Sequence, residues 1–118
     1  MTRAIAEVEG KDDNAIHKDK IDQLISAINQ DVEQRDVFAK GVLIGNHYRL
    51  KPLEQREDPF TKTVVNLAKQ YRYALITTAD LYLVVVYLLQ HPENEVTKKA
   101  RRAAIFGANG ELVKFPLP

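Results

Sequence analysis

Gly41-Val42-Leu43-Ile44-Gly45 is the stretch that decides the fold. A continuous apolar run bounded by glycines is typical of a strand covered on both faces in a parallel sheet. Residues 73–77 form another such run, and residues 4–9 alternate small or apolar with charged side chains, which is the period of a strand. We therefore expect three strands, with residues 41–45 as a central one.

Helical periodicity separates these strands. Residues 18–35 repeat apolar side chains at helical spacing, and Asp58-Pro59 is typical of the cap and first position of a second helix. Thr78 can cap a third helix over residues 79–90, which is apolar nearly all round and is therefore expected to be well buried. Asn94 can cap a short basic helix that runs to about residue 103. The apolar face of the second helix is expected to consist of Phe60, Val64, Leu67, Ala68 and Tyr71.

Alternating strands and helices predict an α/β fold. We expect a mainly parallel or mixed central sheet with helices on both faces, in a single domain over residues 1–118. Residues 105–106 and 112–115 flank Asn109-Gly110, which predicts a β-hairpin at the C-terminal end.

Composition excludes several classes of protein. The net charge of +1 gives no overall attraction to nucleic acid, and the absence of cysteine excludes disulfides and thiolate chemistry and fits a cytoplasmic protein. The longest apolar run, residues 81–89, is far shorter than a membrane span of about 20 residues. There is no glycine-rich nucleotide loop, serine nucleophile elbow or histidine pair with metal-ligand spacing.

Candidate site residues lie on the first strand and just after it, and in the loop after the central strand. Glu7, Glu9 and Lys11 are expected to project from one side of the first strand, an arrangement that suits a metal ion and a phosphate or, alternatively, a solvated surface with a Glu9–Lys11 ion pair. Residues 46–58 form a long polar loop after the central strand and carry His47, a further candidate. Both segments follow strands of the same direction, so they are expected to share one rim of the sheet.

Basic residues suggest contacts with nucleic acid. Arg49 and Arg56 in the long loop have the geometry to bind phosphate, or they pair with nearby acidic residues and hold the loop. The last helix carries a dense group of cations, which either follows a phosphate backbone or is simply solvated. This group consists of Lys98, Lys99, Arg101 and Arg102.

The order of these segments resembles the restriction-endonuclease-like (PD-(D/E)xK) nuclease superfamily, and its Mrr-type branch is closest in layout. The resemblance runs through about residues 4–90 and rests on short, degenerate motifs. The matching segments are Glu7-Val8-Glu9-Gly10-Lys11, a helix with Gln23-Leu24, Lys40-Gly41-Val42-Leu43-Ile44, Pro59-Phe60 opening a helix with Ala68, Ala74-Leu75-Ile76-Thr77-Thr78, and Asp80-Leu81.

The resemblance implies phosphodiester hydrolysis with Mg²⁺ or Mn²⁺, held by an aspartate and by the acid of an acid-x-lysine motif on a strand. Two registers are open: Glu7 as the acid with Glu9 where lysine is expected, or Glu9 as the acid with Lys11. In either register Glu7 and Glu9 are the expected metal ligands, with Lys11 near the phosphate. Gln23 matches a helix position that the family uses near its site, or is an ordinary surface amide.

The chain departs from the family pattern at its N-terminal end. The family's metal-binding aspartate lies on a hairpin before the motif strand, and only residues 1–5 precede that strand here. We therefore expect a truncated core, either a fragment or a natural short form, whose exposed first strand pairs with a second copy in a homodimer. Two functions follow: a metal-dependent DNA nuclease, or an inactive nuclease-fold module for DNA binding or protein association.

Overall fold

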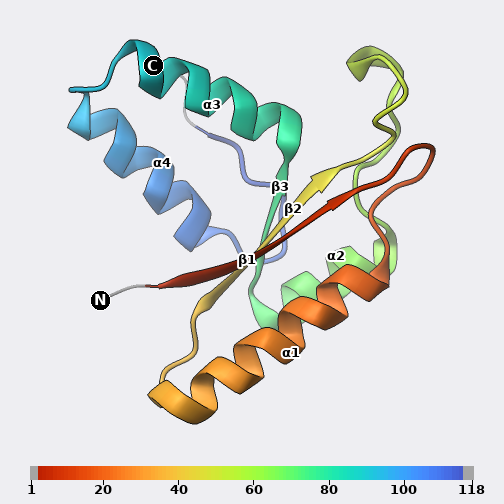
Figure 1. The fold of residues 1–118 in the computed structure, drawn as a ribbon, viewed down its shortest axis with the longest axis vertical. Coiled ribbons are helices and arrows are strands. Elements are labelled where there is room, and N and C mark those ends of the chain that lie inside the picture. The colour runs from red at the N-terminus through yellow and green to blue at the C-terminus, as the bar shows by residue number, and fades with distance from the viewer. Residues whose placement is uncertain (1–2, 116–118) are drawn as a thin grey trace.

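The computed structural model describes residues 3–115. Three strands, β1 (Ala4–Gly10), β2 (Lys40–Asn46) and β3 (Ala74–Thr77), form a parallel sheet in the order β1-β2-β3 (Figure 1). Leu43 is paired with Glu7 on one side and with Leu75 on the other. The α/β class and the central position of the glycine-bounded run are therefore confirmed.

Within the described residues, four α-helices lie on the two faces of this sheet, and a short 3-10 helix (Leu53–Gln55) lies in the loop after β2 (Figure 1). α1 (Lys18–Arg35) and α2 (Lys62–Tyr71) cover one face, and α3 (Thr78–Gln90) and α4 (Glu95–Gly107) lie on the other. Between residues 3 and 115, no helix is long and apolar enough to cross a membrane.

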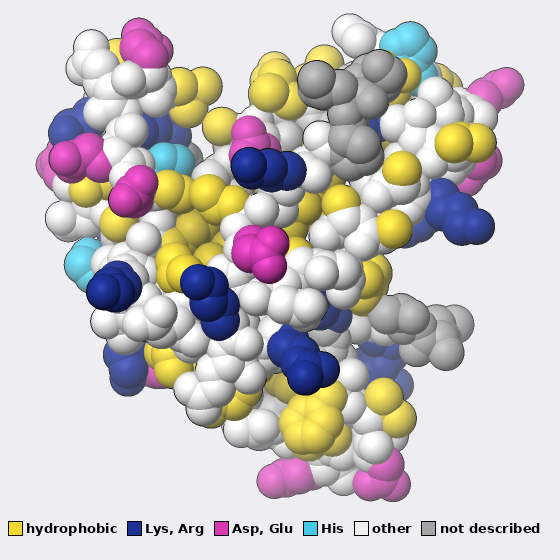
Figure 2. All heavy atoms as spheres, turned by 180° about the vertical axis from the view of Figure 1, so that it is seen from behind, with side chains coloured by type: hydrophobic (Ala, Val, Ile, Leu, Met, Phe, Trp, Pro, Cys, Tyr) yellow, Lys and Arg dark blue, Asp and Glu magenta, His cyan; other side chains and the backbone are white. Residues whose placement is uncertain are grey.

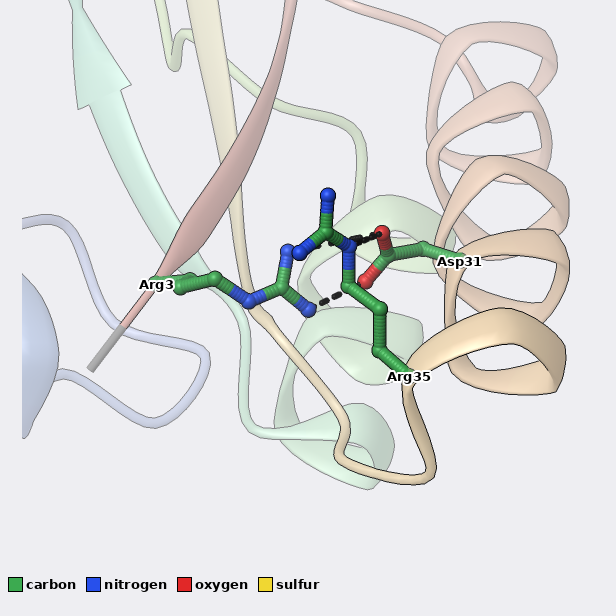
Figure 3. A network of polar contacts seen from close by, with 3 residues as sticks. All are labelled: Arg3, Asp31 and Arg35. Atoms are coloured by element: carbon green, nitrogen blue, oxygen red, sulfur yellow. Dashed lines mark hydrogen bonds and ion pairs between the residues drawn. The ribbon is translucent and has the colours of Figure 1, made fainter. Parts of the chain in front are cut away.

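α1 has the predicted bounds, and its charged residues tie it to β1. Asp31 bonds both Arg3, immediately before β1, and Arg35 in the last helical turn (Figure 3). The Arg3 Nη2 to Asp31 Oδ2 distance is 2.5 Å, and the Arg35 Nε to Asp31 Oδ1 distance is 3.3 Å. The Arg3 hydrogen bond lowers the pKa of Asp31, so the carboxylate stays charged and holds the strand to the helix.

α2 begins later than the Asp58-Pro59 pattern predicts. Its N-cap is Thr61, whose Oγ1 accepts a hydrogen bond from Val64 N at 3.3 Å. Phe60 forms a parallel bridge with Ile16, and Ile16 N donates to Pro59 O at 2.8 Å. The backbone before Thr61 is therefore extended, and the prediction of a helix from residue 59 is wrong.

α3 is less buried than its apolar sequence predicts. Thr77, rather than Thr78, is its N-cap, and Val84 is its only buried residue. Tyr82, Leu83 and Leu89 are 66%, 65% and 76% exposed. The prediction of a well-buried helix is wrong because α4 and the sheet cover only part of its surface.

The predicted C-terminal hairpin is also wrong. Ile105 and Phe106 belong to α4, since apolar side chains of its last turns pack onto the sheet. After the turn at Gly110, which has a φ of 91°, Leu112 forms a parallel bridge with Leu75. Residues 110–113 therefore run beside the outer edge of β3, and β1 forms the opposite edge of the sheet.

Candidate functional site

The carboxyl ends of the three strands lie side by side, as the expectation of a shared rim requires. Gly10 is paired with Asn46, and Gly45 with Thr77. Beyond the strands, Lys11 N donates to Asn46 O at 3.0 Å, and Arg49 N donates to Lys11 O at 2.8 Å. The end of β1, the loop after β2 and the start of α3 thus form one edge, the usual position of ligand sites in parallel sheets.

Glu7 and Glu9 share the half-buried face of β1. Burial alternates along the strand, with Ile5, Glu7 and Glu9 partly covered and Val8 61% exposed on the other face. Lys11 Nζ lies 3.2 Å from Glu9 Oε1, in an ion pair whose two side chains are 27% and 14% exposed. The Glu9–Lys11 ion pair, which the sequence offers as the alternative to a metal and phosphate site, is therefore present.

One oxygen of Glu9 stands out within this ion pair. Glu9 Oε2 is buried, and no donor among residues 3–115 forms a hydrogen bond with it. A buried carboxylate oxygen without a donor is costly, because the charge has lost water and gained no partner. Lys11 compensates the charge of Glu9 through the other oxygen only. Glu9 Oε2 therefore has unused capacity to accept a proton donor or a cation.

Glu7 and Glu9 are the residues of β1 that could hold a divalent metal ion. In the part of the chain that the structure describes, no three His, Cys, Asp or Glu side chains are grouped to hold a metal ion. Mg²⁺ is commonly bound by one or two carboxylates together with water and substrate phosphate. Glu7 and Glu9 match that smaller ligand set.

The polar contacts of Gln23 do not involve the acidic face of β1. Its side chain is exposed on α1, and its Oε1 accepts a hydrogen bond from Lys20 Nζ at 3.0 Å. No hydrogen bond found for it between residues 3 and 115 reaches β1. Its geometry is that of a surface amide, one of the two interpretations open from the sequence.

Arg49 and Arg56 both hold the loop after β2. Arg49 pairs with Asp12, and Arg56 donates from Nη1 to Asn46 Oδ1 at 3.1 Å. Two further Arg56 donors reach backbone oxygens, those of Lys51 at 3.0 Å and of Arg49 at 3.4 Å. The loop-holding alternative is therefore realised, though the partners are Asp12, Asn46 and carbonyl groups rather than the acidic residues expected.

The four cations of α4 do not form one solvent-exposed face. Arg101 is only 5% exposed, and its guanidinium carbon lies 4.6 Å from the centre of the Tyr87 ring. Lys98 contacts Glu95 and the carbonyl of Pro92, whereas Lys99 and Arg102 are exposed. From behind, Lys and Arg side chains are scattered among acidic ones rather than gathered in one patch (Figure 2).

A pocket that the sequence did not reveal lies between the loop after β2 and the first turn of α3. Its volume is about 640 Å³. Its polar lining consists of Asn46, His47, Arg56, Thr77, Thr78 and Asp80. The sequence indicates the long loop and its histidine, but no local pattern shows that this loop faces Thr77 and Thr78, thirty residues further along the chain.

His47 is one of the buried polar residues that line this pocket. It is 8% exposed, and no hydrogen bond to its Nδ1 is found within residues 3–115. Burial lowers the pKa of His47 and the Arg56 charge lowers it further, while Asp80 opposes them in part. His47 is therefore neutral near pH 7.

No protein-family model matches the chain, and comparisons with curated proteins and with solved structures gave no significant match. The resemblance to restriction-endonuclease-like nucleases stays a prediction. Two features of the rim bear on function, the acidic face of β1 and the pocket beside α3.

Proposed function

We propose that the chain carries the acidic strand of a divalent-metal-dependent site for DNA phosphodiester hydrolysis. The observation that carries this proposal is the state of Glu9, whose Oε1 pairs with Lys11 Nζ while its buried Oε2 has no donor among the described residues. Glu7 lies on the same strand face, one pleat away, and both carboxylates are partly shielded from water.

Glu7, Glu9 and Lys11 each have a definite role in the proposed site. Glu7 and Glu9 hold Mg²⁺ or Mn²⁺, which supplies Lewis-acid stabilisation of the phosphate and a more acidic bound water. Lys11 keeps its ammonium close to Glu9, at 3.2 Å, and at the open rim it can attract a phosphate oxygen. Partial burial strengthens all of these charge interactions relative to bulk water.

Manganese binding tests the proposal directly. We expect calorimetry on the purified chain to give saturable binding, weakened at least about tenfold by Glu9→Gln, since this change removes a charged ligand but keeps the shape. Glu7→Gln should act in the same direction. The matched control is Glu33→Gln on the exposed surface of α1, which should leave binding unchanged.

Two results would contradict the metal site. Absence of saturable binding in the unmodified chain would exclude it, and equal weakening by Glu9→Gln and Glu33→Gln would point to non-specific attraction. Where binding is specific, cleavage of supercoiled DNA with Mn²⁺ should be lost in Glu9→Gln.

A second candidate function is association of the chain with a second copy through β1. This strand is an edge of the sheet in the described structure, and its outward face exposes Val8 at 61%. An unpaired edge with an apolar side chain favours pairing with another strand. Sedimentation should reveal a dimer that Val8→Lys dissociates, and a monomer at high concentration would exclude this candidate.

A further inference from the structure

The pocket beside α3 has the position and size of a small-molecule site. It opens at the carboxyl ends of β2 and β3, where ligands bind in parallel sheets. Its volume of about 640 Å³ is in the range found for ligand pockets. It is separate from the acidic face of β1, because none of Glu7, Glu9 and Lys11 lines it.

The inner end of the pocket favours an anion. α3 is 13 residues long, and its first N–H groups carry the positive end of the helix dipole. Thr77 Oγ1 accepts from Asp80 N at 3.2 Å, which leaves the N–H groups of Thr78 and Ala79 without an acceptor inside the helix.

Arg56 adds a fixed positive charge at the same place. Its Nε, Nη1 and Nη2 bond Lys51 O, Asn46 Oδ1 and Arg49 O, so the guanidinium is held rigidly. A guanidinium has five N–H donors, and three such bonds leave two of them for a ligand. An anion bound here would meet a preorganised partner rather than a mobile side chain.

Two buried polar atoms of residues that line the pocket have no hydrogen-bond partner among the described residues. His47 is more than nine-tenths buried with no hydrogen bond at Nδ1, and Thr78 Oγ1 is buried and equally unpartnered within residues 3–115. Buried polar groups without hydrogen bonds are rare and costly in folded proteins. A ligand with several oxygen atoms would satisfy both, since the hydroxyl group and a neutral imidazole can each donate.

The mouth of the pocket is apolar. Leu53, Tyr82 and Leu83 line it and are 59%, 66% and 65% exposed, which is high for side chains of this size. An aromatic ring and two branched side chains suit a flat, weakly polar group such as a base. Asp80, an exposed residue that also lines the pocket, can accept a hydrogen bond from a sugar hydroxyl and also limits the positive charge, which disfavours a triphosphate.

We propose that this pocket binds a nucleoside monophosphate, with its phosphate between Arg56, Thr78 and the start of α3 and its base against Tyr82. The site needs no metal ion and does not depend on Glu7 or Glu9. It is therefore a binding activity distinct from hydrolysis at β1, and the two proposals can fail separately.

Binding of AMP, adenosine and inorganic phosphate to the metal-free chain, in the presence of a chelator, tests this site. We expect AMP to bind more tightly than either part alone, with chemical-shift changes of the backbone amides at Thr78 and Ala79. Arg56→Gln and the isosteric Thr78→Val should each raise the Kd for AMP, Arg56→Gln by about tenfold or more. Tyr82→Ala should weaken AMP but leave phosphate unchanged.

The controls separate the pocket from general effects on α3 and on charge. Leu89→Ala alters an even more exposed side chain on the same helix outside the pocket, and Glu9→Gln alters the other site, so neither should change the Kd for AMP. Failure of AMP to bind saturably, or an unchanged Kd in Thr78→Val and Arg56→Gln, would overturn the proposal. Thr78→Val keeps the test decisive if Arg56→Gln disturbs the loop.

Discussion

The two faces of the sheet differ in how completely the helices cover them. On the α1 and α2 face, Ile21, Leu24, Leu43 and Val64 have no exposed surface at all. On the α3 and α4 face, the buried cluster is smaller, and five large apolar residues of the two helices are at least 45% exposed. These five are Tyr82, Leu83, Val85, Leu89 and Val96.

This contrast separates stability from binding. A close-packed cluster stabilises the fold through burial of apolar area, which is worth about 25 cal/mol for each Å² removed from water. Exposed apolar side chains contribute little to that total and instead mark surfaces that contact ligands or other chains. The pocket beside α3 opens on the sparsely covered side, while α1 and α2 fix the strands whose ends form the rim.

The largest expected difference between the two faces comes from truncating leucine. Leu43→Ala should reduce the free energy of unfolding by about 2–5 kcal/mol, because it leaves a cavity in the centre of the sheet. Leu89→Ala, at a position 76% exposed, should change it by less than about 0.5 kcal/mol. Urea denaturation measures both, and similar losses in the two variants would contradict the contrast.

Glycine positions give a smaller test of the same contrast. A Cβ at Gly45 would lie 2.5 Å from Ile16 Cγ1, so Gly45→Ala should cost about 1–3 kcal/mol through overpacking. A Cβ added at Gly107, the last residue of α4, would have no atom of residues 3–115 within 4 Å, apart from its chain neighbours and the backbone of its own helix. Gly107→Ala should therefore be neutral or slightly stabilising. Thermal unfolding of both variants measures this difference, and a lower stability of Gly107→Ala than of Gly45→Ala would show that α4 is packed more tightly than its exposure indicates.

Local patterns predicted the well-covered face better than the other one. The apolar period of α1 gave its bounds, and the glycine-bounded run gave the central strand, because each pattern matches a local period that burial then reinforces. The apolar sequence of α3 shows that this helix favours an apolar environment, but not that this chain supplies one. That is why its predicted burial was wrong.

The structure around the C-terminal turn and the pocket beside α3 both depend on contacts between distant segments. Asn109-Gly110 did reverse the chain, but not within a hairpin, because a glycine with positive φ occurs in many kinds of turn. Packing of Ile105 onto the sheet kept the preceding residues helical. Of the candidate site, the pairing of Glu9 with Lys11 was predictable from strand alternation. The pocket was not, because it exists only where the loop carrying His47 meets the cap of α3.

Arg101 provides a test within the sparsely covered face. Its Nε and Nη1 are buried without an acceptor between residues 3 and 115, and contact with the Tyr87 ring recovers only part of the cost of removing the charge from water. Arg101→Leu should therefore raise the free energy of unfolding by about 1 kcal/mol or more. Arg102→Leu, at the exposed neighbouring position, should change it by no more than about 0.5 kcal/mol. A marked loss of stability in Arg101→Leu would mean that the guanidinium has a partner.

The smallest expected effect concerns the pH dependence of stability that His47 contributes. Its folded-state pKa lies below the ordinary value of 6.5, because burial and the nearby Arg56 disfavour the charged imidazole more than Asp80 favours it. Between the folded and unfolded pKa values the unfolded chain binds more protons, so stability must fall as the pH decreases from 6.5 toward the folded value. His47→Gln removes this titration and should flatten the decline, whereas His17→Gln, at an exposed position, should leave it unchanged. Urea midpoints between about pH 5 and 7.5 provide the comparison, and an equally steep decline in His47→Gln would assign it to other groups.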